Sequence, residues 1–210
     1  MTRQRPIATI RTQVSVPLQF ADGYAATARV FSFEGLVDGQ EHLAFQLGEP
    51  NGGVPLVRPH SECLTGDVFG SQRCDCGPQL REAVERIADA GGYLLYLRQE
   101  GRGIGLYAKL EAYTLQDTGL DTYEANVALG HAEDERSYLV AAQMLEALGV
   151  YEIALLSNNP DKARQLAGYG VRVAARVPTR VHLSEANSRY LVTKARRGAH
   201  TLDVDVEATG

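Results

Sequence analysis

The chain has 210 residues, of which 44% are hydrophobic and 22% charged, a composition typical of a folded globular protein. Its formal net charge is −5, so an overall positive field for nucleic-acid binding is excluded and an anionic ligand would need a local basic pocket. No apolar run approaches the ~20 residues of a membrane-spanning helix. The start, MTRQRPIATIRTQ, lacks the apolar core of a secretory signal, so we expect a cytoplasmic protein that binds no membrane.

The first third of the chain is predicted to be rich in β-strands. Residues 1–14 are interpreted as a flexible or extended N-terminal arm. Segments rich in β-branched and aromatic residues follow, separated by turn signals such as Asp22-Gly23. These segments predict strands over residues 14–20, 26–33 and 42–48.

From residue 78 onward, helix and strand patterns alternate. Pro78 opens a helix that the pair Gly91-Gly92 ends. The later expected elements are a strand over 93–97, a helix over 106–116, a helix after Asp134, a strand over 153–156, a helix through Leu166 and a strand over 171–175. The predicted fold is mixed α/β, with a β-rich N-terminal portion and an alternating α/β core with a mixed sheet. We expect one domain over 15–200 and a disordered tail over 201–210.

The cysteines of the chain, Cys63, Cys74 and Cys76, lie in one short polar segment. Their odd number argues against a disulfide framework, and thiolates are preferred ligands of zinc. Three protein ligands leave one position open, as in catalytic zinc sites, whereas a fourth ligand from His60 would close a structural site. The alternative is three unrelated buried cysteines, which their clustering disfavours.

An open three-thiolate zinc site is suited to hydrolysis. It lowers the pKa of bound water toward ~7. Zinc deaminases use a three-ligand site to attack an electron-poor carbon of a nucleobase, with a nearby glutamate moving protons. Glu62 precedes the first cysteine and could do this work, and a solvated surface glutamate is an equal alternative.

Two segments carry groups suited to phosphate. Residues 98–105, RQEGRGIG, follow a predicted strand and precede a predicted helix, where α/β proteins bind ligands. Glycines there allow close backbone approach, and arginines pair with phosphate. Residues 157–162, SNNPDK, repeat the arrangement with Lys162. A glycine-rich surface turn and an ordinary capped helix are the alternatives.

The chain resembles the GTP cyclohydrolase II family. The matching segments, in order, are HSECLTGDVFGSQRCDCGPQL, RQEGRGIGL, AYTLQDTGLDTYEAN, DERSY, LLSNNPDK and NSRYLVTK. The resemblance implies zinc-dependent hydrolysis of GTP to a diaminopyrimidine ribosyl phosphate, formate and diphosphate, the first step of riboflavin biosynthesis. It also implies Mg²⁺ with the nucleotide phosphates and a homodimer.

By position, the resemblance also implies roles for individual residues. Cys63, Cys74 and Cys76 would hold zinc. Asp134 would accept a proton, Arg136 would act as a nucleophile toward the α-phosphate, and Tyr113 would act in ring opening. The implied nucleotide contacts are Arg58, Pro59, His60, Ser61, Glu62, Gln79, Glu100, Gly101, Arg102, Thr122, Ser157 and Lys162. A guanidinium is a poor nucleophile because its pKa exceeds ~12, so electrostatic clamping of the α-phosphate is the alternative role of Arg136.

The chain departs from the family pattern at Pro59, Ala108 and Ser157. Pro59 removes a backbone donor, whereas Ser157 keeps the hydroxyl of the usual threonine. Two other functions stay open: a paralogue that stops at a formylated pyrimidine or serves a specialised pathway, and a zinc-bearing nucleotide-binding protein without turnover. The presence of Tyr113 argues against early arrest but says nothing about the pathway, and the complete set of implied catalytic and metal-binding residues argues against a protein without turnover.

Overall fold

A computed structural model describes residues 7–50 and 53–182, and its centre is a seven-stranded mixed sheet in the order β1-β2-β3-β5-β4-β6-β7. Antiparallel pairing joins β1 to β2, β2 to β3 and β3 to β5, and parallel pairing joins the other neighbours. The strands are β1 (Thr9–Gln19), β2 (Ala25–Glu34), β3 (Leu43–Leu47), β4 (Leu56–Ser61), β5 (Gly92–Leu97), β6 (Glu152–Leu156) and β7 (Arg172–Val177). The predicted mixed α/β fold is confirmed.

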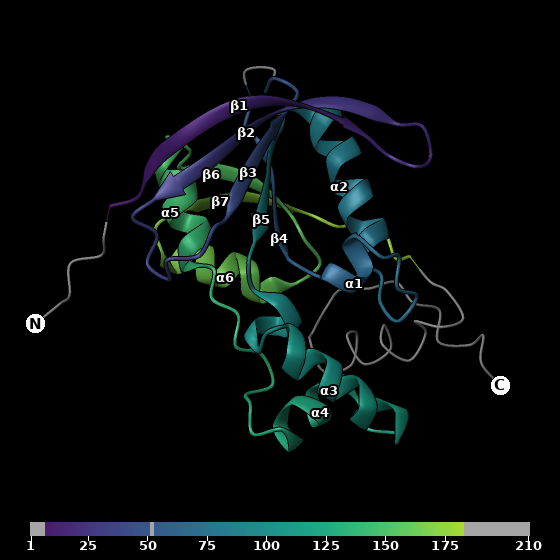
Figure 1. The fold of residues 1–210 in the computed structure, drawn as a ribbon. Coiled ribbons are helices and arrows are strands. Elements are labelled where there is room, and N and C mark those ends of the chain that lie inside the picture. The colour runs from purple at the N-terminus through teal and green to yellow at the C-terminus, as the bar shows by residue number, and fades with distance from the viewer. Residues whose placement is uncertain (1–6, 51–52, 183–210) are drawn as a thin grey trace, which may run out of the picture.

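Helices cover both faces of this sheet (Figure 1). Helix α2 (Cys76–Ala90) packs on one face, and α5 (Leu139–Ala147) and α6 (Pro160–Gly168) pack on the other. Successive strand residues point to opposite faces, so Leu94 joins the core under α2 and Leu95 joins the core under α5. Two apolar layers therefore hold the parallel strands in place.

Helices α3 (Leu106–Asp117) and α4 (Thr122–Ala128) lie together beyond the ends of β4 and β5 (Figure 1). The short helix α1 (Leu64–Asp67) follows β4, and the 3-10 turn η1 (Glu100–Gly103) follows β5. Both therefore start at the carboxyl ends of neighbouring parallel strands, which is where open α/β sheets bind ligands.

Two predicted boundaries are wrong. Residues 9–13, expected in a flexible or extended arm before the first strand, belong to β1, which pairs with β2. The helix expected after Asp134 begins at Leu139, because the preceding residues form a loop that contacts η1, where the Glu135 N–H donates to the Arg102 carbonyl at 2.9 Å. Residues 1–6, the segment NSRYLVTK and the expected tail over 201–210 lie outside the described residues.

Three elements, β4, α1 and α4, were not predicted. Strand β4 contains Pro59, which lacks a backbone N–H. The structure tolerates it because the pairing of β4 with β6 covers only Leu56 and Val57 and ends before Pro59. Within the described residues, no helix is long and apolar enough to cross a membrane.

Candidate active site

The thiols of Cys63, Cys74 and Cys76 converge where β4, α1 and α2 meet. Their sulfur atoms all lie within 4.8 Å of one another, and the Sγ atoms of Cys63 and Cys74 are 3.7 Å apart. Thiolates bound at ~2.3 Å to one tetrahedral zinc are about 3.8 Å apart. The three sulfurs therefore fit a single zinc ion.

Gly66 lets helix α1 pass directly beside these sulfurs. A Cβ atom at this position would lie 2.8 Å from the Sγ of Cys74 and 3.1 Å from the Sγ of Cys63. The first contact is shorter than real Cβ atoms show and the second is tight, so a side chain here would force the thiols to shift.

His60 does not join the thiols as a fourth ligand. Its Nε2 lies 3.2 Å from both carboxylate oxygens of Asp67, and its ring stacks on Tyr96. Asp67 also accepts hydrogen bonds from the Cys63 N–H at 3.0 Å and from the Tyr96 hydroxyl at 2.9 Å. Among the described residues, only the three cysteines form a group able to hold a metal, so a tetrahedral ion held there would keep one open position.

Lys109 on α3 was missed by the sequence analysis, and it is only 8% exposed beside the thiols. Its Nζ donates to the Glu100 carboxylate at 2.8 Å, the Thr65 hydroxyl at 3.0 Å and the Cys63 sulfur at 3.1 Å. Burial lowers the pKa of Lys109, but Glu100 and Cys63 raise it more, so the ammonium is charged at neutral pH. The sequence signal was its spacing of four residues from Tyr113, which puts both on one helix face.

A cleft opens from the thiols toward α3 and α4. Its empty space is about 660 Å³, including open solvent at its mouth. Predicted site residues on its wall are Ser61, Glu62, Cys63, Cys74, Cys76, Glu100, Gly101, Arg102, Tyr113, Thr122 and Arg136. Residues on its wall that the sequence analysis did not single out are Arg73, Ile104, Lys109, Ala112, Gln116 and Asn126.

The turn η1 places Arg102 on the cleft wall in an unusual conformation. Arg102 has φ +63, in the left-handed region, directly after Gly101 at φ +62. The Glu135 N–H holds the Arg102 carbonyl, and the guanidinium lies 4.3 Å from the centre of the Tyr123 ring. A strained backbone that several contacts maintain is typical of a functional site.

Asp134 and Arg136 form an ion pair in the loop before α5. The Nε of Arg136 donates to Asp134 at 2.8 Å, a second contact joins Nη2 to the same carboxylate, and Nη1 of Arg102 lies 3.5 Å from it. Burial raises the pKa of Asp134, but the two arginines lower it more, so its pKa is below the usual value. Asp134 is therefore a carboxylate that orients Arg136 toward the cleft.

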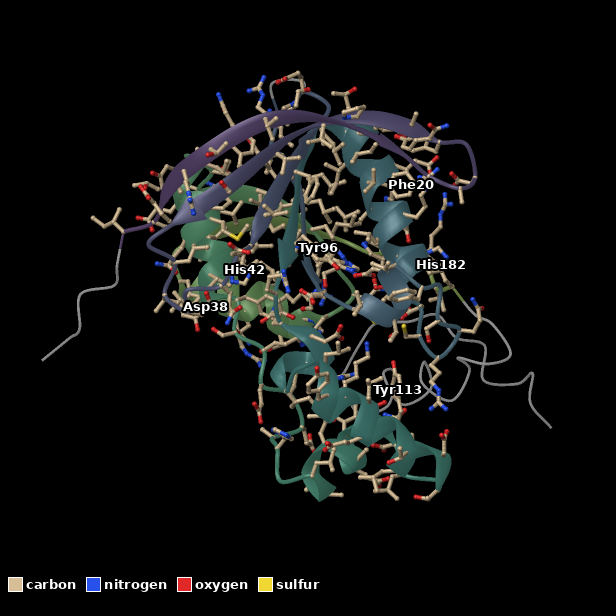
Figure 2. The ribbon with its side chains drawn as sticks, in the orientation of Figure 1. Phe20, Asp38, His42, Tyr96, Tyr113 and His182 are labelled. Atoms are coloured by element: carbon tan, nitrogen blue, oxygen red, sulfur yellow. The ribbon has the colours of Figure 1, made fainter. Side chains whose placement is uncertain are left out.

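Tyr113 lies on α3 (Figure 2) and lines the cleft together with the three cysteines. Its hydroxyl lies 3.5 Å from the Thr65 hydroxyl, and the Arg73 guanidinium lies 4.9 Å from the centre of its ring. Burial raises the pKa of the phenol, so Tyr113 is a neutral hydrogen-bond donor at neutral pH.

A second set of predicted residues is buried at the carboxyl ends of β4 and β6, outside the cleft wall. Arg58 donates from Nη2 to Gln79 at 2.7 Å and from Nη1 to the Leu156 carbonyl at 3.1 Å. Lys162 donates to the Pro59 carbonyl at 2.8 Å. The Ser157 hydroxyl accepts the Asn159 N–H at 3.1 Å.

Comparison with known proteins identifies the family. The sequence model of the family described as GTP cyclohydrolase II matches residues 11–178. The chain belongs to the GTP cyclohydrolase II family. It is 53% identical over 179 residues to "GTP cyclohydrolase-2" of Vibrio vulnificus, covering 84% of this chain and 90% of the relative.

Longer proteins contain the same region. The chain is 53% identical over 192 residues to "Riboflavin biosynthesis protein RibBA" of Bacillus subtilis, which covers 90% of this chain and 47% of that protein. A solved structure of a two-domain 3,4-dihydroxy-2-butanone 4-phosphate synthase from A. baumannii matches with a TM-score of 0.42 and 22% identity, covering 86% of this chain and 42% of that one.

In this member of the GTP cyclohydrolase II family, the implied site residues divide into two groups. Tyr113 and Arg136 line one cleft together with the implied zinc ligands, and Asp134 accepts a hydrogen bond from Arg136. The implied nucleotide contacts Arg58, Pro59, His60, Gln79, Ser157 and Lys162 do not line it. The three cysteines, Arg102 and Arg136 therefore lie on one cleft, and the second group lies in a neighbouring cluster.

Proposed function

We propose that the chain hydrolyses GTP in the cleft above the thiols, releasing formate and diphosphate and leaving a diaminopyrimidine ribosyl phosphate for riboflavin synthesis. Membership of the GTP cyclohydrolase II family supports the reaction. The observation that carries it is the juxtaposition of three thiols with two arginines, Arg102 and Arg136, on one cleft wall. A nucleobase can meet the metal end while phosphates meet the arginines.

Zinc held by Cys63, Cys74 and Cys76 would supply the acidification of water, lowering its pKa toward ~7. Glu62 lines the cleft beside Cys63 and forms an ion pair with Arg98. We assign Glu62 the transfer of protons between water and the purine ring. Tyr113, a neutral phenol within reach of the same end, would donate a hydrogen bond during ring opening.

Arg136 and Arg102 would bind the phosphates. A guanidinium has five N–H donors in a planar fork and suits phosphate oxygens. Asp134 occupies part of the Arg136 fork and fixes its direction. Arg136 therefore acts by electrostatic stabilisation of the departing diphosphate, in which Mg²⁺ would assist. This role does not require the guanidinium to act as a nucleophile.

The buried cluster at β4 and β6 would extend the nucleotide site. The Nε of Arg58 and the Nδ1 of His60 are buried and have no hydrogen-bond partner among the described residues. Unpaired buried polar atoms are rare and indicate a ligand or water. Lys162 binds the Pro59 carbonyl of β4, and Ser157 accepts the Asn159 N–H in the turn after β6, so in this proposal they also support the ends of these two strands.

One incubation tests the reaction. The zinc-loaded protein is mixed with GTP and Mg²⁺, formate and diphosphate are quantified, and the pyrimidine is identified by mass spectrometry. Equal amounts of formate and diphosphate, with a deformylated pyrimidine, are expected. Diphosphate without formate would indicate early arrest, and nucleotide binding without any product would overturn the proposal.

Two variants link this chemistry to the thiols. Cys74→Ser should lose zinc and formate release together, whereas Gln72→Ala, an exposed change in the same loop, should keep both. Formate release at the normal rate from zinc-free Cys74→Ser would refute the metal site. Sedimentation of the same preparation tests the homodimer that the family resemblance implies.

A further inference from the structure

Lys109 is a buried cation on the cleft wall to which the proposed reaction gives no task. An ammonium has three N–H bonds, and three acceptors surround this one: Glu100, Thr65 and the Cys63 sulfur, at 2.8 to 3.1 Å. Each N–H is thus matched to a protein acceptor. Lys109 is therefore poorly placed to bind a phosphate and well placed to act on the thiols.

The charges at the thiol end explain why a cation is needed there. Three thiolates around one Zn²⁺ carry a net charge of −1, and the Glu100 carboxylate beside them adds another negative charge. This region is largely removed from water, where unbalanced charge is unfavourable. The ammonium of Lys109 lies between the two groups and contacts both.

We propose that Lys109 is a positioning residue of the zinc centre, whose N–H···S hydrogen bond to Cys63 balances the charge of the three thiolates. The proposal rests on the zinc site of the proposed function. A hydrogen bond to a ligand sulfur withdraws electron density from it, so the metal stays a stronger acid toward water. Hydrogen bonds to a metal-binding side chain fix its orientation as well as its charge.

Lys109 also orders the hydroxyl groups beside the thiols. The Thr65 hydroxyl oxygen accepts a hydrogen bond from Lys109, so the hydroxyl proton of Thr65 points away from the ammonium. The Tyr113 hydroxyl lies 3.5 Å from the same Thr65 oxygen. Glu100 is fixed in turn, since its second oxygen accepts the Leu64 N–H at 2.7 Å. The Lys109 ammonium therefore connects Cys63, Thr65 and Glu100. Thr65 contacts Tyr113, and Glu100 belongs to η1, which also carries Arg102.

A purely structural salt bridge is the competing explanation. Lys109 and Glu100 would then only tie α3 to η1, and their loss would lower stability without changing the metal. Two measurements separate the explanations, because loss of a purely structural salt bridge would leave both measured values unchanged. These are the affinity for zinc in a competition with a chromogenic chelator, and the thiolate-to-metal charge-transfer band of the Co²⁺-substituted protein.

The variants are Lys109→Met, which keeps the length without the charge, and Lys109→Arg, which keeps the charge. Glu111→Gln, an exposed charge change on the same helix, is the control. We expect Lys109→Met to lose about 10-fold to 100-fold in zinc affinity. Its cobalt band should move to lower energy because the Cys63 sulfur becomes more electron-donating. Lys109→Arg should recover most of both properties, and circular dichroism checks the fold of each variant.

The outcomes distinguish this proposal from the proposed function. If the wild-type protein binds zinc, and folded Lys109→Met shows the same zinc affinity and the same cobalt band, the role of Lys109 is refuted while the zinc site stands. If the wild-type protein binds no zinc, both proposals fail. If Lys109→Met is unfolded, Lys109→Gln decides, because it removes the charge and keeps a polar side chain: a folded Lys109→Gln with the zinc affinity and the cobalt band of the wild type would overturn the proposal.

Discussion

Replacement of Gly66 by alanine tests how tightly the thiol cluster is built. Gly66 lies in helix α1, and its φ is outside the left-handed region, so the backbone itself accepts alanine. Alanine in a helix is favoured over glycine by about 0.5–1 kcal/mol. Backbone preference alone therefore predicts a small gain in stability.

The sulfurs reverse this expectation. The added Cβ would lie 2.8 Å from the Sγ of Cys74 and 3.1 Å from that of Cys63, so one or both thiols must move. Overpacking a buried site costs about 1–3 kcal/mol. The net change in the free energy of unfolding is then a loss of between about zero and 2.5 kcal/mol. Displaced thiols can no longer meet one tetrahedral ion, so zinc binding should weaken as well.

Gly168→Ala is the matched control, because Gly168 is helical, has no positive φ and has no atom within 4 Å of its added Cβ. Urea unfolding of the metal-free proteins measures stability, and chelator competition measures zinc affinity. Gly168→Ala should be neutral or slightly stabilising and should bind zinc normally. A Gly66→Ala protein that is as stable as this control and binds zinc as tightly would refute the packing argument.

Three further predictions address the chemistry and the fold. Tyr113→Phe should retain zinc and diphosphate release but lower formation of the deformylated pyrimidine by about 100-fold, measured by mass spectrometry; an unchanged product ratio would remove Tyr113 from the mechanism. Arg136→Gln should lower kcat/KM by about 100-fold to 1000-fold, and Arg136→Lys by less, whereas equal losses would contradict a charge role. Burial raises the pKa of Glu82, but the Arg180 N–H and the side chains of Arg86 and His182 lower it more, so its pKa is below 4.5. The Glu82 carboxylate therefore stabilises the fold above pH 4.5, and this stabilisation is lost as the pH falls through the lowered pKa. The unfolding free energy of Glu82→Gln, measured in urea, should fall less steeply below pH 4.5 than that of the wild type.

The clustering of the three thiols was predictable because its signal is local. Cys63, Cys74 and Cys76 lie close in sequence, and thiolate chemistry limits what such a cluster can do. The alternation after residue 78 was equally local, since α2 and β5 each carry an apolar pattern of their own. The mixed sheet followed from these patterns.

The errors occurred where tertiary contacts decide the conformation. Strand β4 reads as LVRPHS, and its polar residues conceal a buried strand because Arg58 and His60 find partners on α2, β6 and α1. The loop from Asp134 was assigned to a helix because its contacts with η1 are remote in sequence. Lys109 was missed because a lysine on a helix is normally solvated, and only the fold brings the thiol of Cys63 to it.

The candidate site combines three segments of the chain, and Glu100 fixes the position of two of them, the segment after β4 and η1, relative to each other. The thiols come from the segment after β4, and the arginines come from η1 and the loop before α5. One Glu100 oxygen accepts the Leu64 N–H at 2.7 Å, and the other accepts Lys109 and the Gly101 N–H at 2.8 and 3.0 Å. Because both oxygens already have protein donors, Glu100 is better suited to set the distance between the thiols and the arginines than to bind a ligand itself. In the proposed function, a nucleotide whose base meets zinc and whose phosphates meet the arginines would require such a spacer.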